Sequence, residues 1–142
     1  MPLPAHLTLE IVTPDRAIAH DQVDEVEIPG ADGYFGVLPG HTPLLASLQV
    51  GELWYRKAGE TFYLSIAFGF AEVLPDRVTI LAQMAERADE IDISRAEEEK
   101  RRAEAQLARR PSDAELETAR ISMLKALVRL RVATRARTRS RP

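Results

Sequence analysis

The sequence predicts two domains of different class: an N-terminal antiparallel β-sandwich over residues 1–86 and a C-terminal antiparallel two-helix hairpin over residues 87–142. Three observations predict this division. Residues 1–86 carry four Lys and Arg against twelve Asp and Glu, whereas residues 87–142 carry fifteen against ten. Every glycine lies at or before Gly69. The apolar period also changes, from two in the first part to a helical spacing in the second.

Strands are predicted where apolar and polar residues alternate. In residues 6–12 the apolar face holds Leu7, Leu9 and Ile11, and the pattern returns in residues 62–66 and 78–82. Many short strands with tight turns and no helix between them indicate a sandwich or flattened barrel of about 85 residues. The predicted turns are Thr13-Pro14-Asp15, Pro29-Gly30, Pro39-Gly40, Lys57-Ala58-Gly59-Glu60 and Pro75-Asp76.

Two helices are predicted after the strands. Residues 90–110 are rich in Ala, Glu and Arg, with either Ser94 and Glu97 or Asp92 alone as the cap. Pro111 ends this helix and a second capping box starts at Ser112. A connection of about four residues makes the helices antiparallel. Apolar residues of the second helix recur at Leu116, Ala119, Met123, Leu127 and Leu130.

The inner stripe of the first helix is thin. It offers Ala96, Ala103 and Leu107, and Lys100 interrupts it. At ~25 cal/mol per Å² of buried apolar area, such a stripe contributes little. We therefore expect the C-terminal part to switch between packed and extended states.

Composition excludes several function classes. There is no cysteine, hence no disulfide, thiolate zinc site or cysteine nucleophile. His6, His20 and His41 lack metal-ligand spacing with one another, so no metal is expected. The longest apolar run, residues 64–71, is far shorter than the ~20 residues of a membrane-spanning helix, and the first residues lack the features of a secretory signal. We expect an intracellular chain that meets a membrane only through a partner.

Three segments carry a family resemblance. They are LTLEIVTPDRAI, VDEVEIPGADGYFGVLPGHTPLLASLQVG and IDISRAEEEKRRAE, in this order along the chain. On these the sequence resembles the epsilon subunit of F-type ATP synthases, which is called delta in mitochondria. The resemblance implies a non-catalytic subunit of the rotor in a proton-translocating synthase, with no required cofactor. It also implies a peripheral position at the cytoplasmic face of the bacterial inner membrane.

The resemblance implies partners for each domain. The sandwich is expected at the foot of the rotor, against the gamma subunit and the ring of c subunits. The hairpin is expected either to fold onto the sandwich or to extend along gamma toward the catalytic beta and alpha subunits, where it restrains ATP hydrolysis.

The segment of residues 30–51 holds five glycines and two prolines and is predicted to be a docking surface rather than a catalytic loop. The resemblance places Asp32, Gly33 and Tyr34 against the polar loops of the c ring, with His41 in the turn nearby. Tyr34 is expected to offer an apolar ring and a polar tip. A histidine in a Pro-Gly turn is predicted to be a hydrogen-bonded structural residue, since no nucleophile accompanies it.

An acidic run in the first part is assigned no site. Its residues lack the glycine and terminal glutamate of a calcium loop at the required offsets, and they alternate with apolar residues, which favours a solvated strand face. They are Asp21, Asp24, Glu25 and Glu27.

The motif IDISRA raises the possibility of ATP as a regulatory ligand. It matches the pattern Ile/Leu-Asp-x-x-Arg-Ala with which some bacterial family members bind ATP. Arginines seven apart on one helix share a face, as do basic residues four apart on the next, so a hairpin can bring both pairs to one polyphosphate. The resemblance implies a site made of Glu86, Ile91, Asp92 and Ala96 around the base and ribose, and Arg95, Arg102, Lys125 and Arg129 toward the phosphates.

Two points weigh against tight ATP binding. Lys125 stands where the family has arginine, which keeps the charge and loses the bidentate geometry. The motif also has an explanation without ligand, in which Asp92 only caps the helix and Arg95 only pairs with Glu98 or Glu99.

The chain ends in a basic tail, with eight basic residues and no acidic one from Arg120 onward. Such a segment fits a nucleic acid, a membrane surface or an acidic protein. The resemblance favours the third, with Arg129, Arg131 and Arg135 on an acidic loop of the catalytic beta subunit, and no nucleic acid. The last ten residues lack apolar spacing and are expected to be frayed. A stand-alone nucleotide-sensing module and a nucleic-acid-binding protein remain the alternatives.

Overall fold

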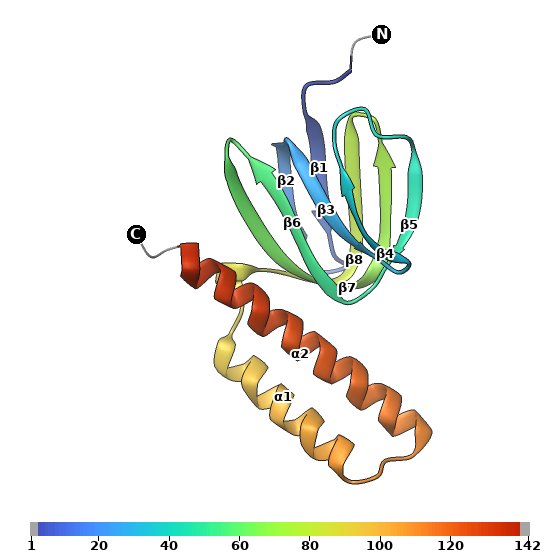
Figure 1. Cartoon of the computed structure of the whole chain (residues 1–142), viewed down its shortest axis with the longest axis vertical. Helices are drawn as coiled ribbons and strands as arrows, with labels where there is room; N and C mark the ends of the chain where they lie inside the picture. Colours follow the sequence, from blue (N-terminus) through green and yellow to red (C-terminus); the bar gives the residue numbers. More distant parts are fainter. Residues whose placement is uncertain (1–2, 140–142) are drawn as a thin grey trace. The chain divides into compact units, whose positions relative to one another are not determined.

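The computed structural model describes residues 3–139, with side chains described for residues 3–135. The chain divides into two compact units, Met1–Arg87 and Ala88–Pro142. The first consists of strands and the second of helices, so the sandwich and the hairpin are both confirmed (Figure 1). Among the described residues, no helix is long and apolar enough to cross a membrane.

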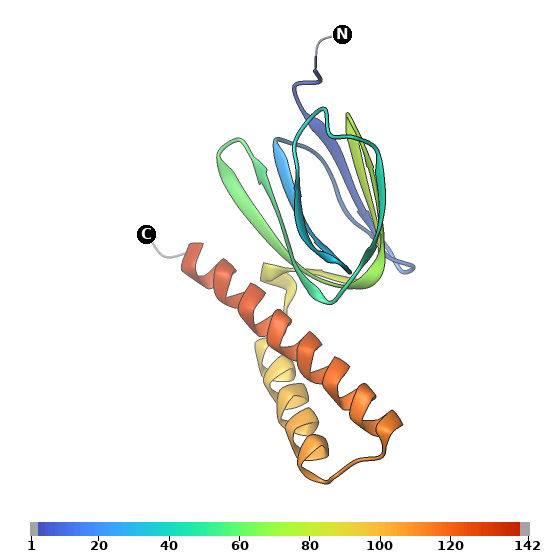
Figure 2. The ribbon, with the colours of Figure 1, turned by 45° about the vertical axis from the view of Figure 1, so that its right-hand side comes forward.

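The first unit contains eight strands in two layers. One layer joins β2, β1, β8, the second half of β7, and β5; the other joins the first half of β7 with β6, β3 and β4 (Figures 1 and 2). The strands are β1 (Leu7–Val12), β2 (Ala17–Val23), β3 (Glu25–Gly30), β4 (Gly33–Val37), β5 (Leu44–Leu48), β6 (Gly51–Lys57), β7 (Glu60–Leu74) and β8 (Arg77–Arg87).

Strand β7 passes from one layer to the other at a bend. It pairs with β6 up to Ile66 and with β5 from Gly69 onward. At the bend Phe68 has φ 59° and Gly69 has φ 121°. A Cβ on residue 69 would come within 2.0 Å of the Leu81 carbonyl oxygen, so only glycine fits here.

The core lies between the layers and follows the predicted alternation. Leu7, Leu9 and Ile11 on β1 are fully buried, as are Leu64 on β7 and Ile80 on β8. Side chains of alternating residues leave a strand on opposite faces, and each layer turns one face inward. The periodicity of the sequence therefore located the core correctly in these strands.

Two details of the sandwich differ from the prediction. β1 and β8 pair in parallel, whereas the other neighbouring strands among the described residues pair antiparallel. β1 and β8 are distant in sequence, so no hairpin turn dictates their direction. Pro29 and Gly30 end strand β3 and are not a turn. The turn is Ala31–Asp32. Gly30 and Gly33 flank it closely, because a Cβ on residue 30 would come 2.7 Å from the Gly33 carbonyl oxygen.

The second unit begins with a 3-10 turn, Ala88–Glu90, followed by α1 (Ile93–Ala108) and α2 (Asp113–Arg139), which pack side by side (Figures 1 and 2). Of the two predicted caps of the first helix, Asp92 is confirmed: its side chain accepts a hydrogen bond from the Arg95 amide, and α1 begins at the next residue. Ser112 caps α2 as predicted, since its Oγ accepts from the Glu115 amide, and the same hydroxyl donates to the Glu115 carboxylate at 3.0 Å.

Small residues form the seam between the helices. Ala96 and Ala103 of α1 are buried, as are Ala119, Ala126 and Ala133 of α2, seven residues apart. Of the apolar residues that recur along the second helix, Ala119 is buried but Leu127 is 38% exposed, because the alanine repeat turns Ala126 inward instead.

The end of α2 also differs from the prediction. The segment expected to fray is helical through Arg139, and residues 140–142 lie outside the described part.

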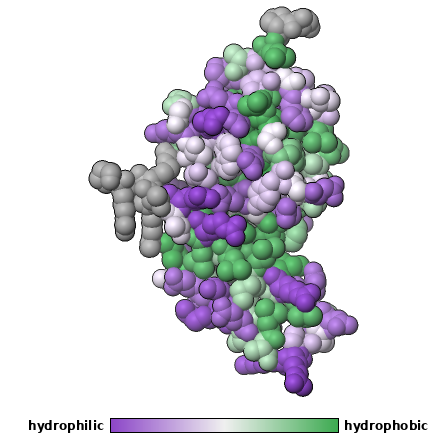
Figure 3. Space-filling view, in the orientation of Figure 1, coloured by the Kyte–Doolittle hydropathy of each residue, from purple (hydrophilic) through white to green (hydrophobic). Residues whose placement is uncertain are grey.

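Hydrophilic and hydrophobic side chains are interspersed over the visible surface of the molecule (Figure 3).

Candidate functional site

The predicted c-ring residues lie at the β3–β4 turn. Asp32 and Gly33 are exposed, and Gly33 has φ 134°, which a residue with a side chain rarely adopts. The turn is held from behind, because the Gln49 side chain donates to the Gly30 carbonyl at 2.7 Å. The sequence thus builds a fixed, exposed corner here.

Tyr34 is used differently from the expectation. Its hydroxyl accepts a hydrogen bond from the Glu52 amide at 3.0 Å, and its ring lies over Gly51, where a Cβ would come 2.4 Å from the hydroxyl oxygen. The polar tip is therefore occupied within the sandwich. Tyr34, which is 47% exposed, offers mainly its ring to a partner.

His41 does not join this corner. Its Nδ1 donates to the Thr42 carbonyl at 2.6 Å, and the neighbouring Gly40 amide donates to the Pro75 carbonyl at 2.7 Å. These bonds match the predicted structural role. β4 spans about 13 Å from Gly33 to Val37 at the usual rise per residue, and His41 follows the turn beyond its far end.

An exposed apolar row on the outer face of the sandwich was not predicted. The register places Phe70 opposite Leu81, and Leu81 opposite Val12, on adjacent strands β7, β8 and β1. Phe70 and Leu81 are 55% and 54% exposed. We call Val12, Phe70 and Leu81 the outer apolar row.

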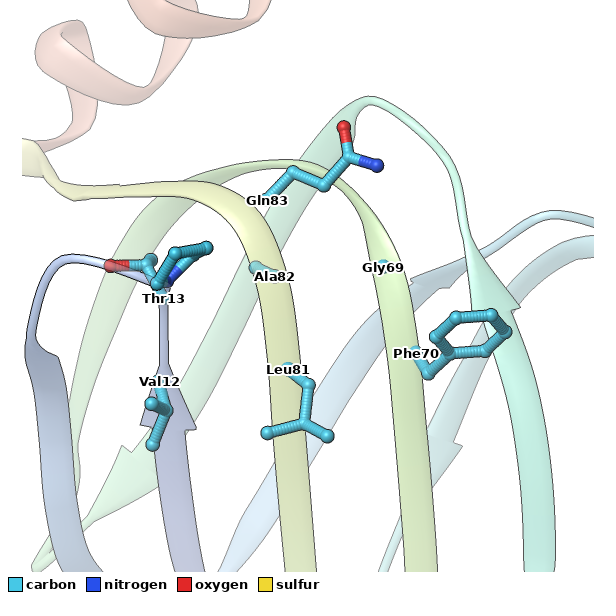
Figure 4. A pocket seen from close by; sticks show the side chains of 8 residues that line it. Val12, Thr13, Gly69, Phe70, Leu81, Ala82 and Gln83 are labelled. Carbon is cyan, nitrogen blue, oxygen red and sulfur yellow. The ribbon is translucent and has the colours of Figure 1, made fainter.

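A depression of about 360 Å³ lies along this row. Figure 4 shows Val12, Leu81 and Phe70 on three neighbouring strands, with Thr13 and Gln83 at the rim. Leu45 on β5, 71% exposed, is a diagonal neighbour of Phe70. Exposed large apolar side chains that gather in this way indicate a contact surface.

The sequence did contain a signal for the row. At residues 70–71 and 80–82 apolar residues occupy both phases of the alternation: Ala71 and Ile80 point inward, while Phe70 and Leu81 point outward. A strand with one solvated face would carry polar residues at the second phase. Two neighbouring strands breaking this rule predict a covered outer face.

In the hairpin, the motif residues around Asp92 serve the start of α1. Asp92 is exposed and forms the N-cap. Ile91 and Ala96 are 8% and 0% exposed. This is the ligand-free role considered for the motif, and it leaves the Asp92 carboxylate at the surface.

Two predicted phosphate-binding arginines meet at one carboxylate. Glu99 of α1 accepts from Arg95 Nε at 3.3 Å and from Arg129 Nη1 of α2 at 2.9 Å. The Arg129 side chain is only 11% exposed, whereas that of Arg95 is 73% exposed. The antiparallel packing predicted from the short connection thus brings Arg95 and Arg129 together.

The other charged residues predicted for the ATP site lie on three different elements. Arg102 is 76% exposed and pairs with Glu98 at 2.9 Å. Lys125 is half-buried on α2, one turn before Arg129. Glu86 lies on β8 and therefore belongs to the sandwich unit.

The basic residues predicted to meet the beta subunit differ in exposure. Arg131 and Arg135 are exposed on α2, whereas Arg129 is held by Glu99. The acidic run of the sandwich is partly occupied by ion pairs: Lys57 Nζ lies 2.5 Å from Asp21, and Arg56 pairs with Glu25. Within residues 3–139, no three potential metal ligands gather.

Family comparisons cover both units. Residues 6–88 match the family described as "ATP synthase, Delta/Epsilon chain, beta-sandwich domain", and residues 89–134 match its "long alpha-helix domain". The ATP synthase epsilon chain of Herpetosiphon aurantiacus is 49% identical over 133 residues, which cover 94% of this chain and 98% of that one. Epsilon chain 2 of Syntrophotalea carbinolica is 47% identical over 130 residues, 91% of this chain and 94% of the relative.

A solved structure shares the fold. A chain in the cryo-EM structure of the Euglena gracilis mitochondrial ATP synthase, described as "OSCP/F1/c-ring in rotational state 1", matches with a TM-score of 0.80 and 24% identity. The match covers 97% of this chain and 84% of that one. With family models matching both units and relatives near half identity over almost the whole length, the chain belongs to the ATP synthase delta/epsilon family.

Proposed function

We propose that this chain is a non-catalytic central-stalk subunit of a proton-translocating F-type ATP synthase, which couples the catalytic part to the c ring. It is peripheral, reaching the cytoplasmic face of the bacterial membrane through the complex. Family membership supports the assignment, and the outer apolar row carries the docking argument.

The row is suited to a permanent partner. Val12, Phe70 and Leu81 are contiguous across three hydrogen-bonded strands, so they present one surface rather than scattered side chains. Covering the exposed halves of Phe70 and Leu81 contributes about 1 kcal/mol each. We assign the gamma subunit to this surface and the c ring to the corner at Asp32 and Gly33.

The docking assignment is tested by adding one charge to the row. Leu81→Glu places a carboxylate in the surface that a partner would cover, and we expect the variant to be lost from the purified synthase complex. Gln22→Glu adds the same charge at an exposed position of β2 and is the control. Circular dichroism of both isolated variants checks that the sandwich still folds. Normal incorporation of Leu81→Glu would contradict the assignment.

The hairpin has a regulatory role in this proposal. It restrains ATP hydrolysis when extended, through basic residues that include Arg131 and Arg135. The thin alanine seam supports an opening at modest cost. Truncation after Arg87 is expected to raise ATP hydrolysis by the reassembled complex, and the double variant Arg131→Glu/Arg135→Glu is expected to raise it less. Unchanged hydrolysis after truncation would remove the inhibitory role and leave the coupling role intact.

Binding of ATP to the hairpin is a second candidate function, supported by one observation. Arg95 and Arg129, from different helices, converge on the same carboxylate, so their guanidinium groups are placed to share an anion. Bound ATP would favour the packed hairpin by mass action. Calorimetry on the full chain is expected to detect binding of ATP, which Arg129→Ala weakens. No heat at millimolar ATP would contradict this function.

A further inference from the structure

Glu99 is the residue that links the basic side chains of the two helices. Its Oε1 accepts from Arg95 Nε at 3.3 Å on the same helix, and its Oε2 accepts from Arg129 Nη1 at 2.9 Å on the other. Each carboxylate oxygen thus serves one arginine. A phosphate group presents its oxygens to arginine forks in a comparable way.

Arg129 needs an anion beside it both in the ligand-free chain and with a nucleotide bound. Its side chain is 11% exposed, and a guanidinium group so far removed from water is costly without a counter-charge. In the ligand-free chain, Glu99 supplies this charge. A nucleotide polyphosphate that reached Arg129 and Arg95 would have to take the same position.

We propose that Glu99 is an internal competitor of the polyphosphate: its carboxylate occupies the anion position between Arg95 and Arg129, and a nucleotide binds only when the carboxylate leaves. This inference rests on the proposed ATP binding and adds the residue that sets its affinity. Glu99 can leave, because its side chain is 37% exposed and borders solvent. The arginines then exchange one anion for another, and the helices stay joined.

A purely structural ion pair makes the opposite prediction. If Glu99 only orients Arg95 and Arg129, its removal disorders both and weakens ATP binding. If it competes, its removal releases two donors and strengthens binding. The sign of the change in affinity therefore separates the two roles.

The experiment is calorimetric titration of the full chain with ATP in three forms: wild type, Glu99→Gln and the control Glu97→Gln. Glu97 is exposed on α1, and its substitution changes the net charge equally. Weakening of the two charge-assisted hydrogen bonds to Glu99 predicts a Kd at least about tenfold lower for Glu99→Gln, with Glu97→Gln unchanged within about twofold. In an Arg129→Ala background, Glu99→Gln should give a smaller gain.

Each other outcome overturns the inference. Unchanged or weaker binding by Glu99→Gln, with binding by the wild type, removes the competitor role and leaves the proposed ATP binding intact. Absence of binding by both forms removes both proposals. Helix content is followed by circular dichroism, with Glu99→Ala as a second variant; loss of helix in both variants would show that the carboxylate is structural.

Discussion

The sandwich and the hairpin are stabilised in different ways. In the sandwich, large side chains such as Leu9, Leu64 and Ile80 are fully buried between two layers. In the hairpin, the buried residues of α1 are Ala96 and Ala103, those of α2 are three alanines with Val128 and Val132, and an ion pair through Glu99 joins the helices. Alanine removes far less apolar area from water than leucine. The two units therefore differ in how much apolar area each buried side chain removes from water.

The largest expected effect lies at the bend of the sandwich. Gly69→Ala places a Cβ 2.0 Å from the Leu81 carbonyl oxygen at φ 121°, and should lower the free energy of unfolding by about 3–5 kcal/mol. Chemical denaturation measures it. The control is Gly36→Ala, which meets nothing within 4 Å and should change stability by less than about 0.5 kcal/mol. Equal stabilities of the two variants would show that the bend adapts easily.

A smaller effect is expected at the hairpin seam. Ala103→Leu inserts a large side chain where only 2% of the alanine is exposed, and should lower the opening free energy of α1 and α2 by about 1–3 kcal/mol. Backbone amides of both helices should exchange hydrogen faster than in the wild type, and amides of the sandwich should exchange at the wild-type rate. Ala105→Leu, at an exposed position of the same helix, is the control. Slower exchange in Ala103→Leu would mean that the seam has room to gain packing.

The cap of α1 should contribute less again. Asp92→Ala removes the acceptor of the Arg95 amide and is expected to cost the helix about 1 kcal/mol. Asp92→Ser keeps an oxygen at this position and should recover most of the loss. Exchange of the first-turn amides of α1 reports both variants. If serine and alanine behave alike, the cap is not what starts the helix.

The smallest effect concerns an exposed pair on the sandwich. The hydrogen bond to Asp21 raises the pKa of Lys57 above its ordinary value. The charged lysine is thus favoured by folding, so the pair's contribution is full below the ordinary lysine pKa of about 10.4 and is lost as the pH rises through the folded-state pKa. NMR titration should find a lower pKa for Lys57 in Asp21→Asn. An unchanged pKa would exclude Asp21 as the cause.

Sequence reasoning was most successful where a local pattern has one structural solution. Period-two alternation located buried residues such as Leu7 and Leu9, and Pro111 with Ser112 marked the boundary between the helices. It was less successful where two distant segments decide the outcome. The parallel pairing of β1 with β8 and the inward turn of Ala126 in place of Leu127 both depend on the neighbour against which a segment packs.

The candidate sites show the same limit. The basic residues of the hairpin could be named from the sequence, but Arg129 and Arg131 carry the same charge and differ in burial, which their charge alone does not indicate. Tyr34 reads as an open contact, yet its hydroxyl bonds the Glu52 amide, eighteen residues along the chain. The outer apolar row was present as a broken alternation in two strands, and only their pairing made it one surface.

By itself the sequence determined the class of each unit, because strand and helix periods, caps and turn residues act over a few neighbouring positions. The sequence also determined that all the glycines lie in the sandwich and that the hairpin is rich in charged residues and alanine. Tertiary structure alone decided which strands pair, that Phe70, Leu81 and Val12 adjoin, and that Glu99 stands between Arg95 and Arg129. These contacts join residues far apart in the chain, and their energies depend on geometry that no local pattern specifies.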